Sequence, residues 1–426
     1  MLTVGDIITG LAVDLDYQGQ GIIKPEGYVI FVPGLIDGEE AKVKIKSLRK
    51  SFGQGEIVEI LKRSIDRVDD VNSALGSCDF IHVSKDKQKK WQSRITKETL
   101  KKIANIDIEM NEILSDDQDK YYRNKNVFQV LDTPFLTLCL FSKDNNKLIP
   151  VSEFILADAK TNEVLKYLSE HKMVINPRVL KYMMFRTNLK GQILITLVAT
   201  KELFVGRNEL IAVLKGISNL AGVTVNIMDD ERSILGRESI TLLGENLIAE
   251  PLKNKNIFVN DRSFFQINLP VIELAYQIIA KNIDKDKVVI DAYSGVGSIG
   301  FYLADEAKKV IMIESNAESV EMAKKTKEFY HLDHIEIMDE PAEKIMHLLE
   351  GDVLVVDPPR NGLMPHFIDV LLNKNFEKIF YLSCDVKTLA RDLAMLTTKF
   401  NIAKVHPIKM FYHTTSLETL VILTKK

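Results

Sequence analysis

Residues 287–304 read KVVIDAYSGVGSIGFYLA, and this stretch decides the fold of the C-terminal part of the chain. An apolar strand ends at Asp291, a glycine turn follows, and a helix is expected to begin near Ser298. Gly295 and Gly297 let the backbone approach a ligand at the start of that helix. Helices alternate with further apolar strands, which are expected at residues 310–314, 353–357, 379–383 and 420–423. This alternation predicts an α/β, Rossmann-like domain with a mainly parallel, doubly wound sheet.

An acid at the end of the following strand adds support for a nucleoside site in this turn. Glu314 lies 19 positions after Gly295. An acid near this offset can accept hydrogen bonds from both hydroxyls of an adenosine ribose. These residues favour a single-nucleoside cofactor, S-adenosylmethionine, and leave NAD as the alternative.

A second acid is expected at the same edge of the sheet. Residues 353–360 read VLVVDPPR, so an apolar strand ends in Asp357 and two prolines fix the loop that follows. Ligands bind at the carboxyl edge of such sheets, so Asp357 is expected to face the cofactor or the substrate. Capping of a helix is the structural alternative for this acid. Methyltransferases that act on amines place an aromatic residue after the two prolines, and Arg360 stands there instead, which argues against methylation of an amine.

A cysteine follows the next expected strand. Cys384 comes after residues 379–383, at the same edge as Asp357, although cysteines more often serve packing. A thiolate beside a methyl donor suits methylation at C5 of a pyrimidine, because addition of the thiolate to C6 makes C5 nucleophilic. A base must then remove the C5 proton. Glu418, just before the last strand, is the candidate base, with an exposed strand-edge acid as the alternative interpretation, and His413 is a weaker candidate.

These segments resemble a known family. DAYSGVGSIG, VVDPPRNGL, YLSCDVKTLARDL and MFYHTTSLETLVIL are similar to the motifs of the RNA uridine-C5 methyltransferases that form 5-methyluridine. SFFQIN at residues 263–268 and YRNK at residues 122–125 also match. The N-terminal stretch GQGIIKPEGYVIFVPGLIDGE resembles the TRAM domain, an RNA-binding β-barrel found on the 23S ribosomal RNA branch of that family. The resemblance covers nearly the whole chain.

The resemblance implies roles for particular residues. It makes Cys384 the nucleophile and Glu418 the proton acceptor. It also implies five contacts to S-adenosylmethionine, by Gln266, Tyr293, Ser298, Glu314 and Asp357. The target uridine must leave its stack to reach the cysteine.

Two departures from the family pattern have chemical consequences. Many relatives hold an iron–sulfur cluster on four cysteines, but only Cys78 remains here, so no iron–sulfur cluster and no other metal is expected. Ser294 and Asp385 replace a usual cysteine and a usual asparagine. A carboxylate at position 385 is expected to raise the pKa of the neighbouring thiol.

Three domains are expected along the chain. Residues 1–62 form the TRAM-like barrel, residues 63–262 a linker, a basic helix and a central α+β RNA-binding domain, and residues 263–426 the methyltransferase domain. In the barrel, Lys42, Lys44 and Lys46 share one face of a strand and suggest either phosphate contacts or a lysine-protected edge strand. In the basic helix at residues 85–104, three residues are expected to pack inward, namely Trp91, Ile95 and Leu100.

Composition limits the remaining choices. The net charge is −3, so RNA binding must depend on local patches. There is no apolar run of about 18 residues, which predicts no membrane association. The absence of a signal-like start and the three cysteines predict a cytoplasmic protein, expected to be a monomer. The barrel favours 23S rRNA as substrate; tRNA and a non-catalytic RNA-binding assembly factor are the alternatives.

Overall fold

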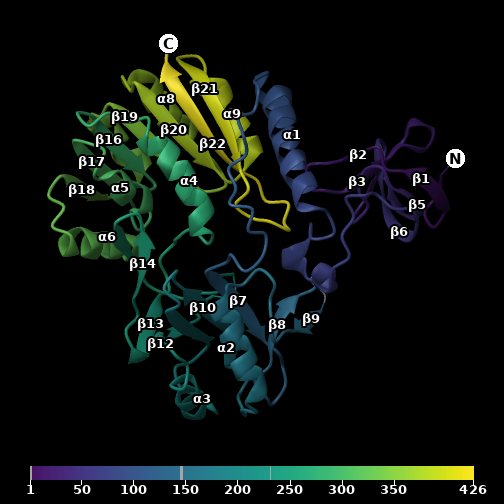
Figure 1. The fold of residues 1–426 in the computed structure, drawn as a ribbon, viewed down its shortest axis with the longest axis horizontal. Helices are drawn as coiled ribbons and strands as arrows, with labels where there is room; N and C mark the ends of the chain where they lie inside the picture. Colours follow the sequence, from purple (N-terminus) through teal and green to yellow (C-terminus); the bar gives the residue numbers. More distant parts are fainter. Residues whose placement is uncertain (1, 144–146, 231) are drawn as a thin grey trace.

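The computed structural model describes residues 2–143, 147–230 and 232–426, and it arranges them in three lobes (Figure 1). The N-terminal lobe is a small β structure, the central lobe is α+β, and the C-terminal lobe is a sheet covered by helices. Helix α1 (Lys85–Ala104) stands between the N-terminal and C-terminal lobes. This confirms the predicted fold class, whereas the exact domain boundaries stay predictions.

The N-terminal lobe is a six-stranded sheet in the order β1-β5-β6-β4-β3-β2, wrapped around its own apolar core. Its strands are β1 (Ile7–Leu11), β2 (Asp14–Leu15), β3 (Gly21–Ile23), β4 (Val29–Val32), β5 (Glu40–Leu48) and β6 (Phe52–Lys62), with a 3₁₀ turn at Pro25–Gly27. The strands pack closely at Gly55, where an added Cβ would lie 2.3 Å from a methyl carbon of Val43.

The lysine stripe, made of Lys42, Lys44 and Lys46, lies on the outer face of this lobe. Val43 and Ile45 point into the core, and the three lysines between and beside them are exposed, as the alternation predicts. The interpretation as an edge strand is wrong, because β5 pairs with β1 on one side and with β6 on the other. Lys42 forms an ion pair with Glu59 at 2.8 Å, and Lys46 pairs with Glu56 at 3.0 Å. Acids on β6 therefore offset part of the stripe's positive charge.

Helix α1 has the boundaries expected from the sequence. The Ser84 hydroxyl accepts a hydrogen bond from the Lys87 amide at the start, and Asn105 ends the helix in a left-handed conformation. Trp91, Ile95 and Leu100 are buried as predicted. The helix packs against α9 (Val386–Leu396) of the C-terminal lobe, although the predicted boundaries group it with the central domain.

Trp91 joins five segments of the chain. It belongs to a buried cluster with side chains from the barrel, the 71–84 segment, α9 and the loop before the last strand, namely Leu15, Ile36, Phe80, Val83, Ile95, Val386 and Leu417. Its indole nitrogen donates to the Asp16 carbonyl at 2.9 Å. The Arg94 guanidinium donates to the Leu15 carbonyl at 3.0 Å. The barrel is therefore fixed to α1 by apolar packing and by hydrogen bonds to its β2–β3 turn.

The central lobe is a mixed seven-stranded sheet in the order β13-β12-β11-β10-β7-β8-β9. Its strands are β7 (Lys125–Val130), β8 (Leu138–Phe141), β9 (Leu148–Pro150), β10 (Leu180–Thr187), β11 (Ile193–Ala199), β12 (Leu220–Ile227) and β13 (Glu238–Gly244). Two helices accompany the sheet, α2 (Ala159–Glu170) and α3 (Arg207–Leu214). Helix α3 ends at Leu214, because the chain turns at Gly216 and at the left-handed Asn219 before β12 begins.

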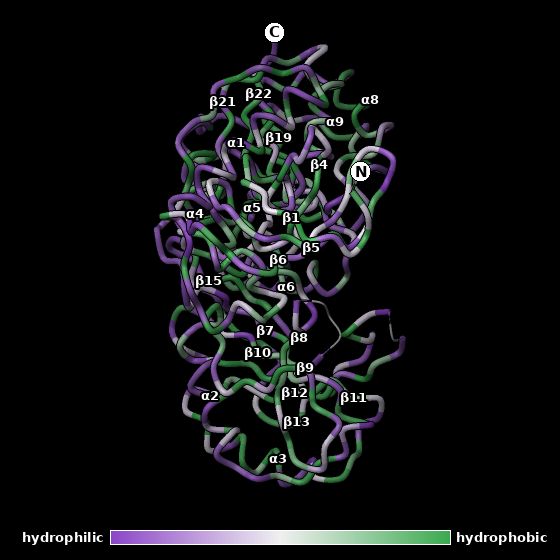
Figure 2. The backbone as a smooth tube through the Cα atoms, turned by 90° about the vertical axis from the view of Figure 1, so that its right-hand side faces the viewer, coloured by the Kyte–Doolittle hydropathy of each residue, from purple (hydrophilic) through white to green (hydrophobic). Residues whose placement is uncertain are grey.

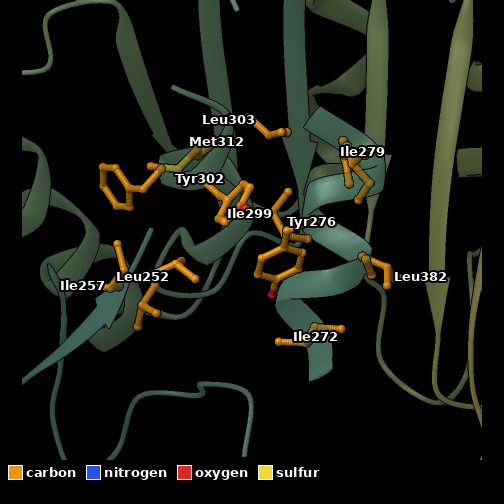
Figure 3. Packing of buried hydrophobic residues seen from close by; sticks show 14 of the residues in the cluster. Leu252, Ile257, Ile272, Tyr276, Ile279, Ile299, Tyr302, Leu303, Met312 and Leu382 are labelled. Carbon is orange, nitrogen blue, oxygen red and sulfur yellow. The ribbon is translucent and has the colours of Figure 1, made fainter. Parts of the chain in front are cut away.

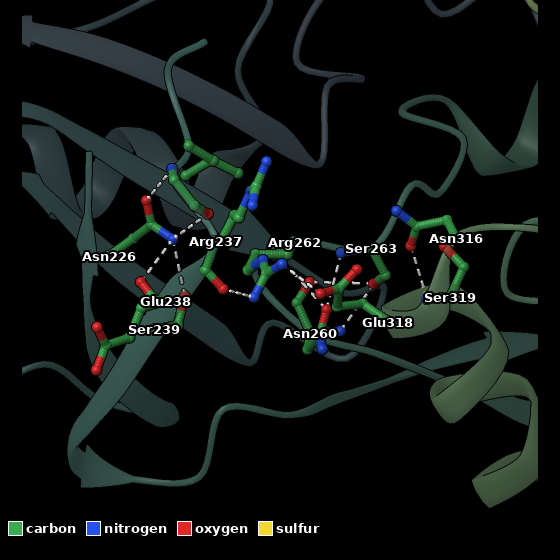
Figure 4. Close-up of polar contacts among 12 residues, drawn as sticks. Asn226, Arg237, Glu238, Ser239, Asn260, Arg262, Ser263, Asn316, Glu318 and Ser319 are labelled. Carbon is green, nitrogen blue, oxygen red and sulfur yellow. Dashed lines mark hydrogen bonds and ion pairs between the residues drawn. The ribbon is translucent and has the colours of Figure 1, made fainter. Parts of the chain in front are cut away.

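A hairpin and a polar turn connect the central lobe to the C-terminal lobe. Strands β14 (Ile248–Leu252) and β15 (Lys255–Val259) pair antiparallel. In the turn that follows, the Asn260 side-chain oxygen accepts hydrogen bonds from the amides of Arg262 and Ser263, at 3.1 and 2.8 Å. Figure 4 shows the Arg262 guanidinium reaching the carbonyl of Arg237 on one side and the carboxylate of Glu318 on the other. This arginine ties the central sheet to the start of helix α6 (Ala317–Phe329).

The C-terminal lobe is a seven-stranded sheet in the order β18-β17-β16-β19-β20-β22-β21. All strands run parallel except β22, which is antiparallel to both of its neighbours. The strands are β16 (Val288–Ala292), β17 (Lys309–Glu314), β18 (Ile335–Asp339), β19 (Val353–Val356), β20 (Lys378–Ser383), β21 (Phe400–Ile408) and β22 (Glu418–Lys425). The helices are α4 (Leu269–Ala280), α5 (Ser298–Leu303), α6 (Ala317–Phe329), α7 (Ala342–Ile345), α8 (Pro365–Asn373) and α9.

Each face of this sheet has its own core, as a doubly wound sheet requires. Val353 and Val355 of β19 pack with α4, α5 and α6, whereas Leu354 and Val356 pack with α8, α9 and the end of α1. Figure 3 shows the first face, where Tyr276 and Ile279 of α4 lie close to residues of α5. The prediction of helices on both faces is confirmed.

Hydrophobic and hydrophilic stretches interleave along the whole chain in Figure 2. In the part of the chain that the structure describes, no helix combines the length and apolarity needed to cross a membrane.

Removal of the Trp91 side chain tests the role of this residue as the joint between lobes. Trp91→Ala is expected to destabilise the protein by about 3–5 kcal/mol, since it empties a buried site and removes a hydrogen bond. Ile103→Ala on the same helix is the control, because Ile103 is 46% exposed, and it should cost less than about 0.5 kcal/mol. Denaturant unfolding followed by circular dichroism measures both; equal effects would contradict the assignment.

Candidate active site at the carboxyl edge of the sheet

The carboxyl edge of the C-terminal sheet gathers most of the predicted site residues. Glu314 ends β17, Asp357 follows β19 and Cys384 follows β20. Tyr293 and Ser298 lie in and just after the turn that follows β16. The parallel register brings these strand ends side by side, with Ala292 of β16 paired to Val356 of β19, and Val356 paired to Tyr381 of β20.

Cys384 and Glu418 meet because β22 runs in the opposite direction to its neighbours. The last paired residues are Ser383 of β20 and Thr419 of β22, so the next residue of β20 lies across from the residue before Thr419. Those two residues are Cys384 and Glu418. Glu418 is 5% exposed, so the alternative of an exposed strand-edge acid is wrong.

Burial and neighbouring acids control the protonation of this pair. Burial raises the pKa of the Cys384 thiol to about 11, with further increases from the charges of Glu418 and Asp357. Burial and the Asp357 charge hold the pKa of Glu418 well above its usual value. Burial raises the pKa of Asp357 to about 7. The nearby Arg360 lowers the pKa of both Cys384 and Glu418.

Of the five predicted cofactor residues, Gln266 and Asp357 contact each other, and the other three bond to different partners. The Gln266 side-chain amide donates to the Asp357 carboxylate at 3.2 Å. The Glu314 carboxylate accepts from the Gly295 amide at 2.8 Å. The Ser298 hydroxyl lies 3.1 Å from the Tyr276 hydroxyl at the start of α5.

Tyr293 points away from those pairs. It has a left-handed backbone with φ of 63°, and its hydroxyl donates to the carboxylate of Glu343 at 2.7 Å. Its ring lies against Phe367, with 5.8 Å between ring centroids. Tyr293 therefore forms one wall beside the glycine turn.

The glycine turn leaves space and unused polar atoms. A Cβ at Gly295 would meet only the Phe264 carbonyl, 3.9 Å away, so the turn is open on that side. The Ser294 hydroxyl and one carboxylate oxygen of Asp291 are buried without a partner among the described residues. Burial raises the pKa of Asp291 to about 8, although the Gly300 amide donates to its other oxygen. A polar ligand that fills this opening is consistent with these groups.

Two buried glutamines of α1 hold the loop that leads to Glu418. The Gln92 amide donates to the carbonyls of Ile408 at 2.8 Å and Glu418 at 3.3 Å. The Gln88 oxygen accepts from the His413 amide at 2.8 Å. The sequence analysis did not identify either glutamine. The feature that could have pointed to them is a pair of polar residues four positions apart on the apolar face of a helix.

His413 is a poor candidate for the base. Its Nδ1 lies 3.1 Å from the Gln88 amide, and its Nε2 lies 3.3 Å from the Asp119 carboxylate. Both ring nitrogens therefore face protein partners, and burial lowers the pKa of this histidine. The ring serves to position the loop.

Asp385 has a structural role in place of the expected electrostatic one. Its carboxylate accepts hydrogen bonds from the amides of Lys387 and Thr388, both at 2.9 Å, and so caps the N-terminus of α9. The rise in the pKa of the thiol comes instead from burial, Glu418 and Asp357.

The other cysteines are packing residues. Cys78 and Cys139 are fully buried, and burial raises the pKa of Cys78 to about 12. No group of three or more His, Cys, Asp or Glu side chains suited to a metal ion occurs within residues 2–143, 147–230 and 232–426.

Alkylation of Cys384 measures the influence of its charged neighbours. Between pH 7 and 9 the rate with iodoacetamide should rise about tenfold per pH unit, because the thiolate is the reactive form. Glu418→Gln should lower the pKa of Cys384, and Arg360→Ala should raise it. Mass spectrometry of the Cys384 peptide gives the rates, with the buried Cys78 and Cys139 as slow internal controls. Shifts of the same sign in both variants would contradict this electrostatic assignment.

Two relatives of known sequence match nearly the whole chain. An RNA methyltransferase of Oceanobacillus iheyensis, described as uncharacterized, is 31% identical over 437 residues, covering 97% of this chain and 95% of that protein. A similarly described protein of Clostridium tetani is 31% identical over 441 residues, covering 98% and 95%.

One solved structure shares the fold over the full length. The crystal structure of Pyrococcus abyssi tRNA (uracil-54, C5)-methyltransferase in complex with S-adenosyl-L-homocysteine superposes with a TM-score of 0.79 and 22% identity. The match covers 98% of this chain and 100% of that chain. At this level of identity the likeness shows the fold alone.

Family models settle the relationship. The model described as tRNA (Uracil-5-)-methyltransferase matches residues 85–426, and the TRAM domain model matches residues 3–58. The family predicted from the motifs is confirmed, while the 23S branch stays a prediction. Because the first match spans well over half of the chain, the protein belongs to the tRNA (uracil-5-)-methyltransferase family and carries a TRAM domain at its N-terminus.

Proposed function

We propose that the protein transfers a methyl group from S-adenosylmethionine to C5 of a uridine in RNA, through a covalent bond between Cys384 and C6. The observation that supports this most is the placement of Cys384 opposite the buried Glu418, with Asp357 and Arg360 beside them. The proposed nucleophile and the proposed base therefore lie next to each other at the carboxyl edge of the sheet, with a second acid nearby. A non-catalytic RNA-binding factor would have no use for this arrangement.

S-adenosylmethionine fits the edge on chemical grounds. The Glu314 carboxylate, beside the open side of Gly295, suits the two hydroxyls of a ribose. Asp357 and Gln266 suit the charged end of the cofactor, while Tyr293 and Ser298 flank the turn. When bound, the cofactor supplies the methyl group. No iron–sulfur cluster is part of this proposal.

Each proton has a destination, which is solvent for the thiol proton and Glu418 for the C5 proton. Cys384 is half-buried, so the thiol proton can leave to solvent before the sulfur adds to C6. The negative charge passes to C5 and O4 of the ring. C5 would then accept the methyl group, whose bond to the sulfonium sulfur breaks and leaves S-adenosylhomocysteine. Glu418 takes the remaining C5 proton, the C6–S bond breaks, and the C5–C6 double bond re-forms. Its raised pKa makes the Glu418 carboxylate a stronger base than an exposed acid.

Two substitutions separate the two steps. Cys384→Ala should abolish both methylation and covalent attachment to RNA, whereas Glu418→Gln should abolish turnover and accumulate the RNA conjugate. RNA that contains 5-fluorouridine should trap the wild type in the same way, since fluorine cannot leave as a proton. Denaturing gel electrophoresis detects the conjugate, and Cys139→Ala is the matched control that should keep activity. Conjugate formation by Cys384→Ala would disprove the mechanism.

The proposal also names the class of RNA that is methylated. The TRAM domain at residues 3–58 supports 23S rRNA, on the resemblance drawn from the sequence. The Pyrococcus abyssi enzyme, named for tRNA, aligns over 98% of this chain, so a barrel-bearing fold is also compatible with tRNA. We therefore propose 23S rRNA with tRNA as the second candidate. The expectation of a cytoplasmic monomer stays a prediction.

Deletion of the gene identifies the substrate. Mass spectrometry of nuclease fragments should show loss of 5-methyluridine from 23S rRNA and an unchanged tRNA pool, because the barrel is proposed to dock ribosomal RNA. The wild-type gene should restore the modification, and the Cys384→Ala gene should not. Loss confined to tRNA would move the assignment to tRNA, and no loss in either RNA would contradict uridine methylation.

A further inference from the structure

A pocket of about 310 Å³ opens beside Cys384, and its walls come from two different lobes. The catalytic lobe contributes Arg360, Cys384, Lys387 and Thr415. The N-terminal barrel contributes Tyr17 and Gln18, from the turn between β2 and β3. A turn far from the catalytic motifs in sequence therefore lines the nucleophile's pocket.

Hydrogen bonds and close packing fix the turn between β2 and β3. The Asp16 carboxylate accepts hydrogen bonds from the amides of Gln18 at 2.9 Å and Gln20 at 2.7 Å. Gly19 has φ of +71°, and an added Cβ would lie 2.7 Å from the ring of Phe80 and 2.9 Å from Thr415. The turn is thus pressed against the loop that leads to Glu418.

The same turn is fixed from the other side by α1. The indole of Trp91 donates to the Asp16 carbonyl and the Arg94 guanidinium to the Leu15 carbonyl. The residue that follows Asp16, Tyr17, is consequently held at the pocket by contacts on both sides of the turn.

Tyr17 combines an aromatic surface with a neighbouring cation. Its side chain is 48% exposed, although the turn that carries it is anchored. The Lys387 ammonium lies 3.3 Å from the centre of the ring, and Arg360 lines the same pocket. An aromatic ring with one cation on its face and a second cation in the same pocket suits a nucleotide, because the ring stacks on a base and the cations attract its phosphate.

We propose that Tyr17, supported by Lys387, is a stacking subsite for a nucleotide adjacent to the target uridine. The TRAM turn then belongs to the active site, and the barrel helps to hold the flipped uridine at Cys384. This inference rests on the proposed function. Because the pocket adjoins the nucleophile, loss of the subsite should affect reaction of bound RNA as well as RNA affinity.

A substitution cycle between protein and RNA tests the subsite. The substrate is a stem–loop that carries the mapped uridine, used intact or with an abasic nucleotide on the 5′ or the 3′ side. With intact RNA, Tyr17→Ala should lower kcat/KM by about 5- to 100-fold, the range for loss of one stacked base. With RNA that is abasic on the stacked side, the wild-type enzyme should show the same reduction in kcat/KM. Tyr17→Ala should cause no further reduction with that RNA.

Further variants separate stacking from folding. Tyr17→Phe keeps the ring and should keep activity, whereas Phe52→Ala removes a 40% exposed aromatic residue elsewhere on the barrel and should leave kcat/KM unchanged. The rate of Cys384 alkylation reports whether the pocket is intact in each variant. An equal loss for Tyr17→Ala on intact RNA and on both abasic RNAs, or no loss on any, would overturn the subsite. Absence of methylation by the wild type would instead overturn the proposed function.

Discussion

The direction of one strand determines the candidate site. In a fully parallel sheet, every strand presents its last residue at the carboxyl edge, and the first residue of a strand lies at the far edge. Strand β22 runs against its neighbours, so its first residue, Glu418, reaches the edge where β20 delivers Cys384. The pairing of Cys384 with a buried acid is therefore a result of backbone topology. The same edge adds Asp357 from β19 and Glu314 from β17.

The reversed strand requires a long return loop, and other parts of the chain hold that loop in place. Gln88 and Gln92 of α1 bind its backbone, and the β2–β3 turn of the barrel presses on Thr415. The barrel, α1 and the loop share the cluster around Trp91. The position of Glu418 thus depends on segments that begin near residue 14 and end near residue 418, and the N-terminal lobe is structurally linked to the chemistry.

Local patterns predicted the inner strands and the site residues at their ends, because buried parallel strands are continuously apolar and precede glycine, proline or acidic residues. Strands β18 and β21 were missed, since they lie at the two ends of the sheet and carry exposed polar residues. The glycine turn and Glu314 favoured S-adenosylmethionine and left NAD as the alternative, and the family motifs then supported the same choice. The contacts of Tyr17 with the pocket and of Gln92 with Glu418 join distant segments, and no local pattern encodes such contacts.

The acidic surroundings of Cys384 have a consequence for the resting protein. A thiol whose pKa is about 11 is ionised in only about one molecule in ten thousand at neutral pH. Thiolates attack peroxides and bind metal ions, whereas thiols react slowly, so a half-buried cysteine held in the thiol form is expected to oxidise slowly. The carboxylates of Glu418 and Asp357 thereby help to hold the sulfur of Cys384 in its protonated, less reactive form in the protein without substrate.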